Sequence, residues 1–224
     1  MREPLSEADV VGTWAGLRPL VKAAASGRTA DLSRRHKVSR SESGVITVTG
    51  GKLTTYREMA EDTVHELVDH LDGLPRSARR CRTARLRLRG AKSGDAGATG
   101  LTRHLADRFG AEASEVRALI QADPTLGEPL VAGLPYVRAE ALHAVRHEMA
   151  TSLDDVLARR TRARLQARDA SAAAAPAVAA LIAADLGWTA EETERQVAAY
   201  VALITAERDA PRPSTAIDGP AAVS

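Results

Sequence analysis

Two glycines followed by a lysine are the sequence's most specific candidate for binding chemistry. Gly50, Gly51 and Lys52 come directly after a β-branched run at 45–49, and a helical spacing of apolar residues follows them. A helix N-terminus presents unpaired N–H groups and a partial positive charge, and glycines let the backbone approach a ligand closely. With the charge of Lys52 added, the turn is suited to an anion or to developing negative charge. The alternative is an ordinary strand-to-helix turn whose backbone angles require glycine. Judged without the other motifs, the turn is better explained by this alternative.

Arginines near the N-terminus are the second set of candidates. Arg18 lies between Gly16 and Pro19, which restrict the local backbone, and Arg34 and Arg35 form a pair. A guanidinium held in a fixed position suits the recognition of a carboxylate or phosphate. Taken singly, each of these residues is more simply explained as a solvated surface arginine.

Two histidines one helical turn apart raise the question of a metal site. His143 and His147 lie four residues apart, with Glu140 and Glu148 nearby, and this spacing can ligate zinc. The HExxH pattern is absent, and the sequence offers no obvious third ligand. We therefore predict a packed or solvated pair and no metal site.

A strand–turn–helix unit must position the glycine turn. The run at 45–49 has strand length, and apolar residues at 56–71 recur at spacings of three and four. Either Thr54 or Thr55 can serve as the N-cap, and Glu58 has the spacing of a capping box with Thr55.

From Leu101 onward the sequence predicts helices only. Thr189 and Glu192 have the capping-box spacing that opens the last of them. The expected helices are 101–109, 112–121, 137–149, 152–168, 173–185 and 190–207.

A basic segment, 76–100, separates the two parts. It contains eight Lys and Arg residues up to Lys92, and Leu86 and Leu88 alternate with arginines. We interpret it as an extended, solvated linker. The alternative is a helical interaction module that binds an acidic partner or a membrane surface through this linker. Because interleaved aromatic residues and DNA-reading motifs are lacking, we expect no nucleic-acid partner.

Composition limits what the chain can be. The 224 residues carry a net charge of +2 and 44% hydrophobic residues, which is enough for a core. Neither a Gly-x-Gly-x-x-Gly loop after a strand nor a Walker-type loop occurs.

Cys81 is the single cysteine, so an internal disulfide is excluded, and we treat this cysteine as incidental. The start lacks signal-peptide features and the apolar stretch 172–184 is short, so we expect a cytoplasmic chain, at most peripheral on the inner face of the membrane.

Three motifs in order resemble a known family. They are Trp14-x-Gly16-Leu17-Arg18-Pro19-Leu20, Leu32-Ser33-Arg34-Arg35-His36 and Gly50-Gly51-Lys52-Leu53-Thr54-Thr55-Tyr56-Arg57-x-Met59-Ala60-Glu61. Together they resemble the C-terminal part of FAD-dependent (respiratory, aerobic) glycerol-3-phosphate dehydrogenase. The segment 136–162 is similar to the helical C-terminal domain of the same family, and the resemblance covers about residues 9 to 207.

The resemblance implies a function. Family members pass a hydride from C2 of sn-glycerol 3-phosphate to flavin N5, forming dihydroxyacetone phosphate, and pass the electrons to quinone. By resemblance, Arg18 and Arg34 belong to the catalytic, substrate-binding side. The predicted FAD-binding residues are Gly50, Gly51, Lys52, Leu53 and Thr54. The family's FAD-phosphate loop lies upstream of these motifs, so we expect this portion to be inactive without an upstream FAD-domain polypeptide.

The resemblance also implies a mixed architecture. We expect a strand–turn–helix remnant of an FAD-binding α/β domain, followed by an all-α domain. The expected divisions are 1–75 for the end of the FAD and substrate domain, 76–100 for the basic linker, 101–207 for the α-helical domain, and 208–224 for a disordered tail.

Overall fold

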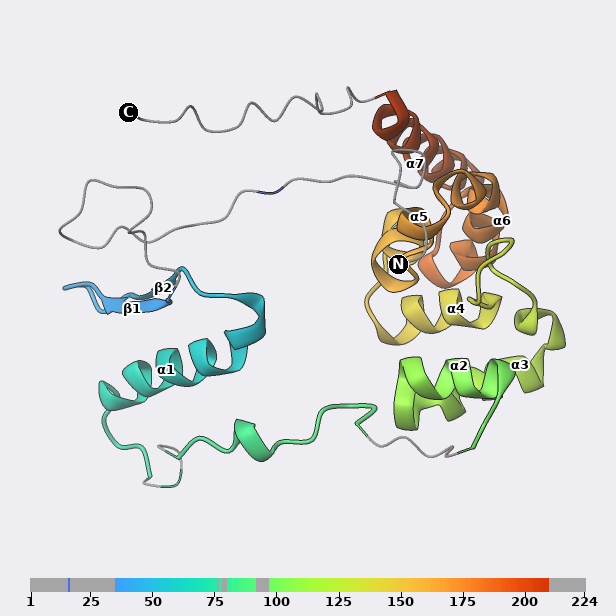
Figure 1. The fold of residues 1–224 in the computed structure, drawn as a ribbon. Coiled ribbons are helices and arrows are strands. Elements are labelled where there is room, and N and C mark those ends of the chain that lie inside the picture. The colour runs from blue at the N-terminus through green and yellow to red at the C-terminus, as the bar shows by residue number, and fades with distance from the viewer. Residues whose placement is uncertain (1–15, 17–34, 76, 78–79, 92–96, 210–224) are drawn as a thin grey trace, which may run out of the picture. The chain divides into compact units, whose positions relative to one another are not determined.

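A computed structural model describes residues 16, 35–75, 77, 80–91 and 97–209 of the chain (Figure 1). Arg18 and Arg34 lie outside these residues, as does the expected tail from residue 210. The described residues divide into two compact units, one ending at Leu88 and one beginning at Arg89.

The first unit contains a β-hairpin. Strands β1 (Lys37–Arg40) and β2 (Ile46–Thr49) pair antiparallel, with Val38 opposite Val48. The predicted strand is therefore present in β2. The sequence analysis missed β1, because a four-residue strand with Val38 as its single apolar residue gives no alternating pattern.

Helix α1 (Tyr56–Asp69) follows the hairpin after a 3₁₀ turn at Leu53–Thr55. The predicted capping box with Glu58 is wrong. The hydroxyl of Thr55 donates a hydrogen bond of 3.2 Å to the carbonyl of Lys52 and does not cap α1. The 3₁₀ turn makes this difference, because its own hydrogen bonds engage Thr55 before the α-helix begins.

Few apolar side chains of this unit are buried. Among its described residues, Val68 is the only buried hydrophobic residue. The exposed large hydrophobic residues of the unit are Val45, Val48, Leu53, Tyr56, Val64, Leu67, Leu71, Leu86 and Leu88. A hairpin and one helix are too small to cover these side chains.

The basic segment is less extended than expected. Thr83–Arg85 form a 3₁₀ turn, and Arg57 on α1 donates a hydrogen bond of 3.2 Å to Oγ1 of Thr83. Leu86 then resumes an extended conformation.

Among its described residues, the second unit consists of helices joined by loops, with one isolated β-bridge between Pro129 and Val137. A 3₁₀ turn at Gly110–Glu112 joins α2 to α3, and another at Pro124–Gly127 follows α3. The helices are α2 (Gly100–Phe109), α3 (Ala113–Ala122), α4 (Arg138–His147), a π-helix at Asp155–Arg160, α5 (Ala163–Gln166), α6 (Arg168–Leu186) and α7 (Ala190–Asp209).

A single hydrophobic core holds this unit together. Its largest fully buried apolar side chains are Leu105 on α2, Leu157 on the π-helix, Ile182 on α6 and Ile204 on α7, with Leu153 just before the π-helix. Helix α6 packs against α4, α5 and α7. The part of the chain that the structure describes is thus mostly helical, with two strands, as the sequence predicted in outline.

The start of α7 confirms its predicted N-cap. The hydroxyl of Thr189 accepts a hydrogen bond of 3.1 Å from the N–H of Glu192. The Glu192 carboxylate pairs with Arg195 and Gln196, so it takes part in side-chain contacts within the first turns of α7.

The single helix predicted at 152–168 is wrong. The chain instead forms the π-helix and then reverses at Arg162, whose φ is +56°, before α5. Thr161 causes the break. Its N–H and its buried hydroxyl both donate to the carbonyl of Val156, five residues earlier, at 3.0 and 2.7 Å.

Helix α6 is longer than predicted. It begins at Arg168, where 173 was expected, and it continues through Pro176. By length and composition it could cross a membrane, but core helices of globular proteins pass the same test. Five of its residues, including Ala175 and Ile182, are buried within this unit.

Candidate functional site

The Gly50–Thr54 turn has the backbone that its sequence predicted. Gly50 and Gly51 have φ angles of +73° and +88°, which are favourable for glycine alone. Lys52 is extended, and the side chains of Lys52, Leu53 and Thr54 are exposed. The turn thus combines an exposed cation with the start of a 3₁₀–α helix, a donor set that fits an anion.

Packing around position 51 is also close. A Cβ atom on Gly51 would overlap the end of the Met59 side chain and would lie 3.3 Å from Cβ of His36. Nε2 of His36 lies 2.7 Å from the carboxylate of Asp62, which ties the start of β1 to α1. Close approach of hairpin and helix therefore favours glycine at position 51 in addition to the positive φ.

Four polar side chains fasten the same helix to the basic segment. Arg57 forms an ion pair with Glu61 and contacts Thr83, whose Oγ1 lies 3.0 Å from Sγ of Cys81. The hydrogen bond from Arg57 lowers the pKa of Glu61 and outweighs the effect of desolvation. Cys81, which the sequence analysis treated as incidental, thus belongs to a polar cluster.

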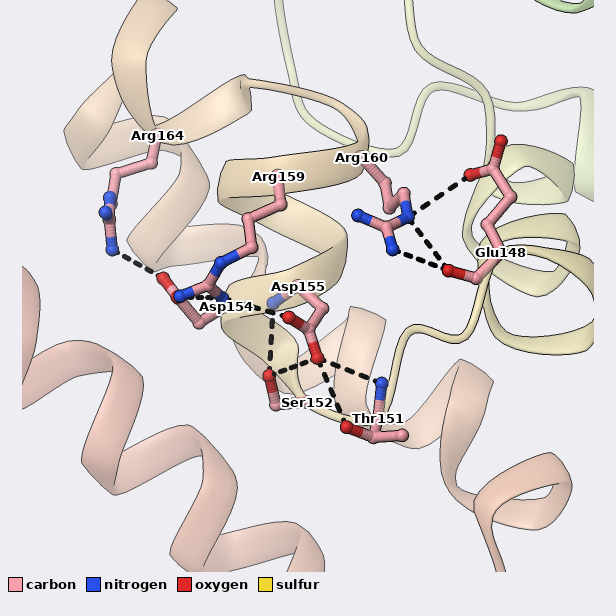
Figure 2. A network of polar contacts seen from close by, with 8 residues as sticks. All are labelled: Glu148, Thr151, Ser152, Asp154, Asp155, Arg159, Arg160 and Arg164. Atoms are coloured by element: carbon pink, nitrogen blue, oxygen red, sulfur yellow. Dashed lines mark hydrogen bonds and ion pairs between the residues drawn. The ribbon is translucent and has the colours of Figure 1, made fainter. Parts of the chain in front are cut away.

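In the helical unit, Asp155 is the centre of the network shown in Figure 2. Its carboxylate accepts hydrogen bonds from the N–H of Thr151 at 3.0 Å, the hydroxyl of Ser152 at 2.9 Å and Arg159 at 3.0 Å. Burial raises the pKa of Asp155, but these donors outweigh burial and hold the pKa below its usual value. Asp155 therefore fixes the turn that enters the π-helix.

Ion pairs extend this network to neighbouring helices. Asp154 pairs with both Arg159 and Arg164, and Nε of Arg164 lies 3.6 Å from the carboxylate of Glu207 on α7. Arg160 donates to the backbone carbonyl of Glu148, just after the last residue of α4 (Figure 2). Because these charges are engaged with one another, the arrangement indicates a structural role.

A buried carboxylate links α2 to α4. Glu140 is 2% exposed, and its carboxylate lies 2.8 Å from Nε2 of His104 and 2.6 Å from Nε of Arg108. It also accepts a hydrogen bond of 2.9 Å from the N–H of Val137 at the start of α4. The Arg108 guanidinium lies 4.9 Å from the ring centre of Tyr136.

Sequence reasoning missed most of these partners. Glu140 was noted only as a neighbour of two histidines, although a glutamate in the first turn of a helix is a capping signal. The pairing of Asp155 with Arg159 has the i,i+4 spacing of a helical ion pair. The pairing of Asp154 with Arg164, ten residues away, depends on the break at Thr161 and is not revealed by local spacing.

Comparison with known families decides the assignment. The sequence profile described as the C-terminal domain of alpha-glycerophosphate oxidase matches residues 81–193. The chain belongs to this family. The matched range contains the whole network of Figure 2 and the buried Glu140.

Relatives of this family extend the similarity on both sides of the matched range. Glycerol-3-phosphate dehydrogenase 2 of Mycobacterium bovis is 38% identical over 217 residues, covering 91% of this chain and 36% of the relative. Glycerol-3-phosphate dehydrogenase 1 of Mycobacterium tuberculosis is 47% identical over 171 residues, covering 72% of this chain and 32% of the relative. The mitochondrial glycerol-3-phosphate dehydrogenase of Mesocricetus auratus is 36% identical over 198 residues, with 81% and 26% covered. The chain thus spans about a third of the length of the curated relatives it matches.

Proposed function

We propose that the chain is the C-terminal portion of a flavin-linked oxidoreductase that converts sn-glycerol 3-phosphate into dihydroxyacetone phosphate. Family membership and the names of the relatives support this reaction class. The cofactor in the proposal is FAD, which when bound accepts the hydride from the substrate, and the electron acceptor is quinone.

The glycine turn is the observation that carries the proposal. Its donor set fits the negative charge that gathers on the pyrimidine edge of a reduced flavin. In the proposed role, Gly50 and Gly51 let the backbone approach this edge, and Lys52 supplies a compensating charge. Leu53 and Thr54 contribute the N–H groups at the start of the helix.

Substrate binding is assigned to two arginines. Arg18 and Arg34 would hold the phosphate of glycerol 3-phosphate by charge-assisted hydrogen bonds, and Arg18 would also polarise the reacting hydroxyl. Both assignments rest on the sequence motifs.

The exposed apolar face of α1 supports an upstream partner. On α1, Val64 is 51% and Leu67 45% exposed; Leu71, two residues after the helix ends, is 44% exposed, and Val68 is the only buried hydrophobic residue among the described residues of this unit. Apolar side chains that recur along one helix face normally pack against another element. We assign this face to contact with an upstream FAD-domain polypeptide, which also supplies the FAD-phosphate loop.

Reconstitution tests the proposal. The 224-residue chain is purified alone and together with an upstream polypeptide from a relative, and flavin absorbance and dye-linked oxidation of glycerol 3-phosphate are measured. We expect activity only in the combined sample. A Lys52→Ala variant should lower that activity, while Lys37→Ala on β1 should leave it unchanged. Full activity of the chain alone would contradict the requirement for a partner. If no combined sample oxidises glycerol 3-phosphate, the assigned reaction is contradicted.

The basic segment favours a second candidate function, which is contact with an anionic membrane surface or an acidic partner. Leu86 and Leu88 are 68% and 66% exposed, and Arg85 and Arg87 beside them are also exposed. Apolar and basic side chains together suit anionic headgroups. This proposal places the chain in the cytoplasm, peripheral to the inner face of the membrane.

Sedimentation with vesicles tests the membrane contact. Binding to vesicles that contain anionic lipid should weaken with salt and disappear when Arg82, Arg85 and Arg87 are replaced by serine. Binding that is unchanged in this variant would remove the second candidate.

A further inference from the structure

Three potential metal ligands meet between α3 and α4, in the helical unit. Glu115 comes from α3, and His143 and His147 lie one turn apart on α4. One ligand atom from each residue lies within 4.8 Å of the other two. The ring centres of the two histidines are also 4.8 Å apart. Helix packing therefore supplies the third ligand that the sequence did not reveal.

The buried histidine of this cluster has unsatisfied polar atoms. His143 is 0% exposed, and neither Nδ1 nor Nε2 has a hydrogen-bond partner among the described residues. Phe109 packs edge-on against its ring, with 4.9 Å between ring centres. Because a neutral imidazole has one donor and one acceptor, burial without partners is unfavourable. A cation bound to the acceptor nitrogen would satisfy that atom.

Charged neighbours determine how available the ligands are. Nη2 of Arg89 lies 3.6 Å from the carboxylate of Glu115, and Arg89 also pairs with Glu112. A cation that binds Glu115 therefore displaces one contact of Arg89 and leaves its pairing with Glu112. Glu148, which lies after His147, adds negative charge to the surroundings and has its own contact with Arg160.

Burial keeps the first ligand in the form that binds metals. Desolvation is the main cause that lowers the pKa of His143, so its imidazole is neutral at lower pH than an exposed histidine. Metal ions bind the neutral imidazole, and protons compete less at such a ligand.

We propose that Glu115, His143 and His147 bind a divalent transition-metal ion such as Zn²⁺, with water in the remaining position. Two imidazoles and one carboxylate are an established donor set for zinc. Ligand atoms around tetrahedral zinc are about 3.4 Å apart, given bonds of about 2.1 Å. The exposed side chains of Glu115 and His147 close the remaining gap by small rotations, while His143 is fixed by packing. The ion joins α3 to α4 and stabilises the folded unit, because it binds only the folded chain.

Metal titration of the full chain tests this site. The 224-residue chain, freed of metal by chelator, is titrated with ZnCl₂ in a calorimeter and with CoCl₂ while the visible spectrum is recorded. We expect one equivalent of each ion to bind, Co²⁺ to show the strong visible absorption of a four-coordinate site, and Zn²⁺ to raise the unfolding temperature.

Variants of exposed residues separate this site from adventitious binding. His147→Ala and Glu115→Gln should each weaken Zn²⁺ binding at least about tenfold, since losing a ligand costs no less than losing an outer-sphere partner. Arg89→Gln should strengthen binding, because it removes a competitor for Glu115. The matched controls, His70→Ala at the C-cap of α1 and Glu194→Gln on α7, should bind Zn²⁺ as the parent chain does. Failure to bind one equivalent, or equal affinity in the His147 and Glu115 variants and in the controls, would overturn the proposal.

Discussion

The carboxylate of Glu140 on α4 lies 2.8 Å from Nε2 of His104 on α2, although the two residues are 36 positions apart. Arg108, one turn after His104, pairs with the same carboxylate at 2.6 Å. The carboxylate is almost inaccessible to water. His104 and the N–H of Val137 both contact Oε1, whereas Oε2 has the ion pair with Arg108 and, among the described residues, no hydrogen-bond partner. This contact fixes α2 against the start of α4.

Removing the charge of Glu140 should destabilise the helical unit. In Glu140→Gln the guanidinium of Arg108 loses its ionic partner while the side-chain shape is kept. We expect the free energy of unfolding to fall by about 2–3 kcal/mol, less than for a fully buried pair because Arg108 is partly solvated. Urea denaturation followed by circular dichroism measures it. Glu128→Gln, which removes the exposed pair with Arg138, is the matched control and should have a much smaller effect. Equal losses in the two variants would contradict this role of Glu140.

The stability of the helical unit should decrease as the pH falls below about 6.5, the ordinary pKa of histidine. Burial lowers the pKa of His143 from its ordinary 6.5, and His147 and Arg89 lower it further, against the opposing charges of Glu148 and Glu115. Between the folded and unfolded pKa values, the unfolded chain binds more protons, so acid favours unfolding. The dependence is at most about 1.4 kcal/mol per pH unit, since one proton is involved.

Urea titrations of the metal-free chain across this pH range measure the effect. His143→Gln, which cannot titrate, should show a flatter dependence than the parent chain. His70→Gln replaces an exposed histidine and should retain the parent slope. If the unfolding free energy of His143→Gln depends on pH as steeply as that of the parent chain, another group causes the acid sensitivity.

Local signals predicted the elements whose boundaries are set locally. The β-branched run gave β2, and the Thr189 cap marked the start of α7, because both depend on residues a few positions apart. The break at Thr161 could not be predicted, because a buried hydroxyl and its carbonyl partner determine it and burial is a property of the folded unit. The predicted helix 173–185 already included Pro176, and α6 does continue through it, held by core contacts of its other face.

The candidate sites also differ in whether their residues are close in sequence or are brought together by packing. The glycine turn is contiguous in sequence, so its backbone and exposed lysine could be read directly. Glu115 could not be associated with His143 and His147, because only the packing of α3 on α4 brings it near. Arg18 and Arg34 stay predictions from the family motifs.

Alanine at position 51 should destabilise the hairpin–helix unit more than alanine at position 73. Both glycines have positive φ, so both variants incur the backbone cost of about 1–2 kcal/mol for a Cβ in this region. Gly51 differs, because its Cβ would overlap Met59, whereas a Cβ on Gly73 meets no atom within 4 Å. Hydrogen exchange of the amides in α1 measures the difference, and adding Met59→Ala to Gly51→Ala should restore part of the protection. Equal protection in the two glycine variants would contradict the packing argument.

Replacing Pro176 by alanine should stabilise α6. Proline lacks an N–H, so the carbonyl of Ala172, four residues earlier, loses its helical partner, and the ring crowds that carbonyl. Pro176 itself is exposed, while Ala175 and Val178 beside it are buried, so the substitution leaves the core unchanged. We expect a gain of about 1–3 kcal/mol from the restored hydrogen bond and higher helix propensity, reduced by the greater freedom of the unfolded alanine chain.

Thermal unfolding measures this gain as a higher midpoint temperature. Ala177→Gly, at the next exposed position of α6, is the reference for the size of the midpoint shift. This variant should lower the midpoint by the equivalent of about 1 kcal/mol. If Pro176→Ala lowers the midpoint while Ala177→Gly behaves as expected, α6 depends on the fixed φ of proline. The proline would then stabilise the chain by restricting its unfolded state by more than the lost hydrogen bond costs.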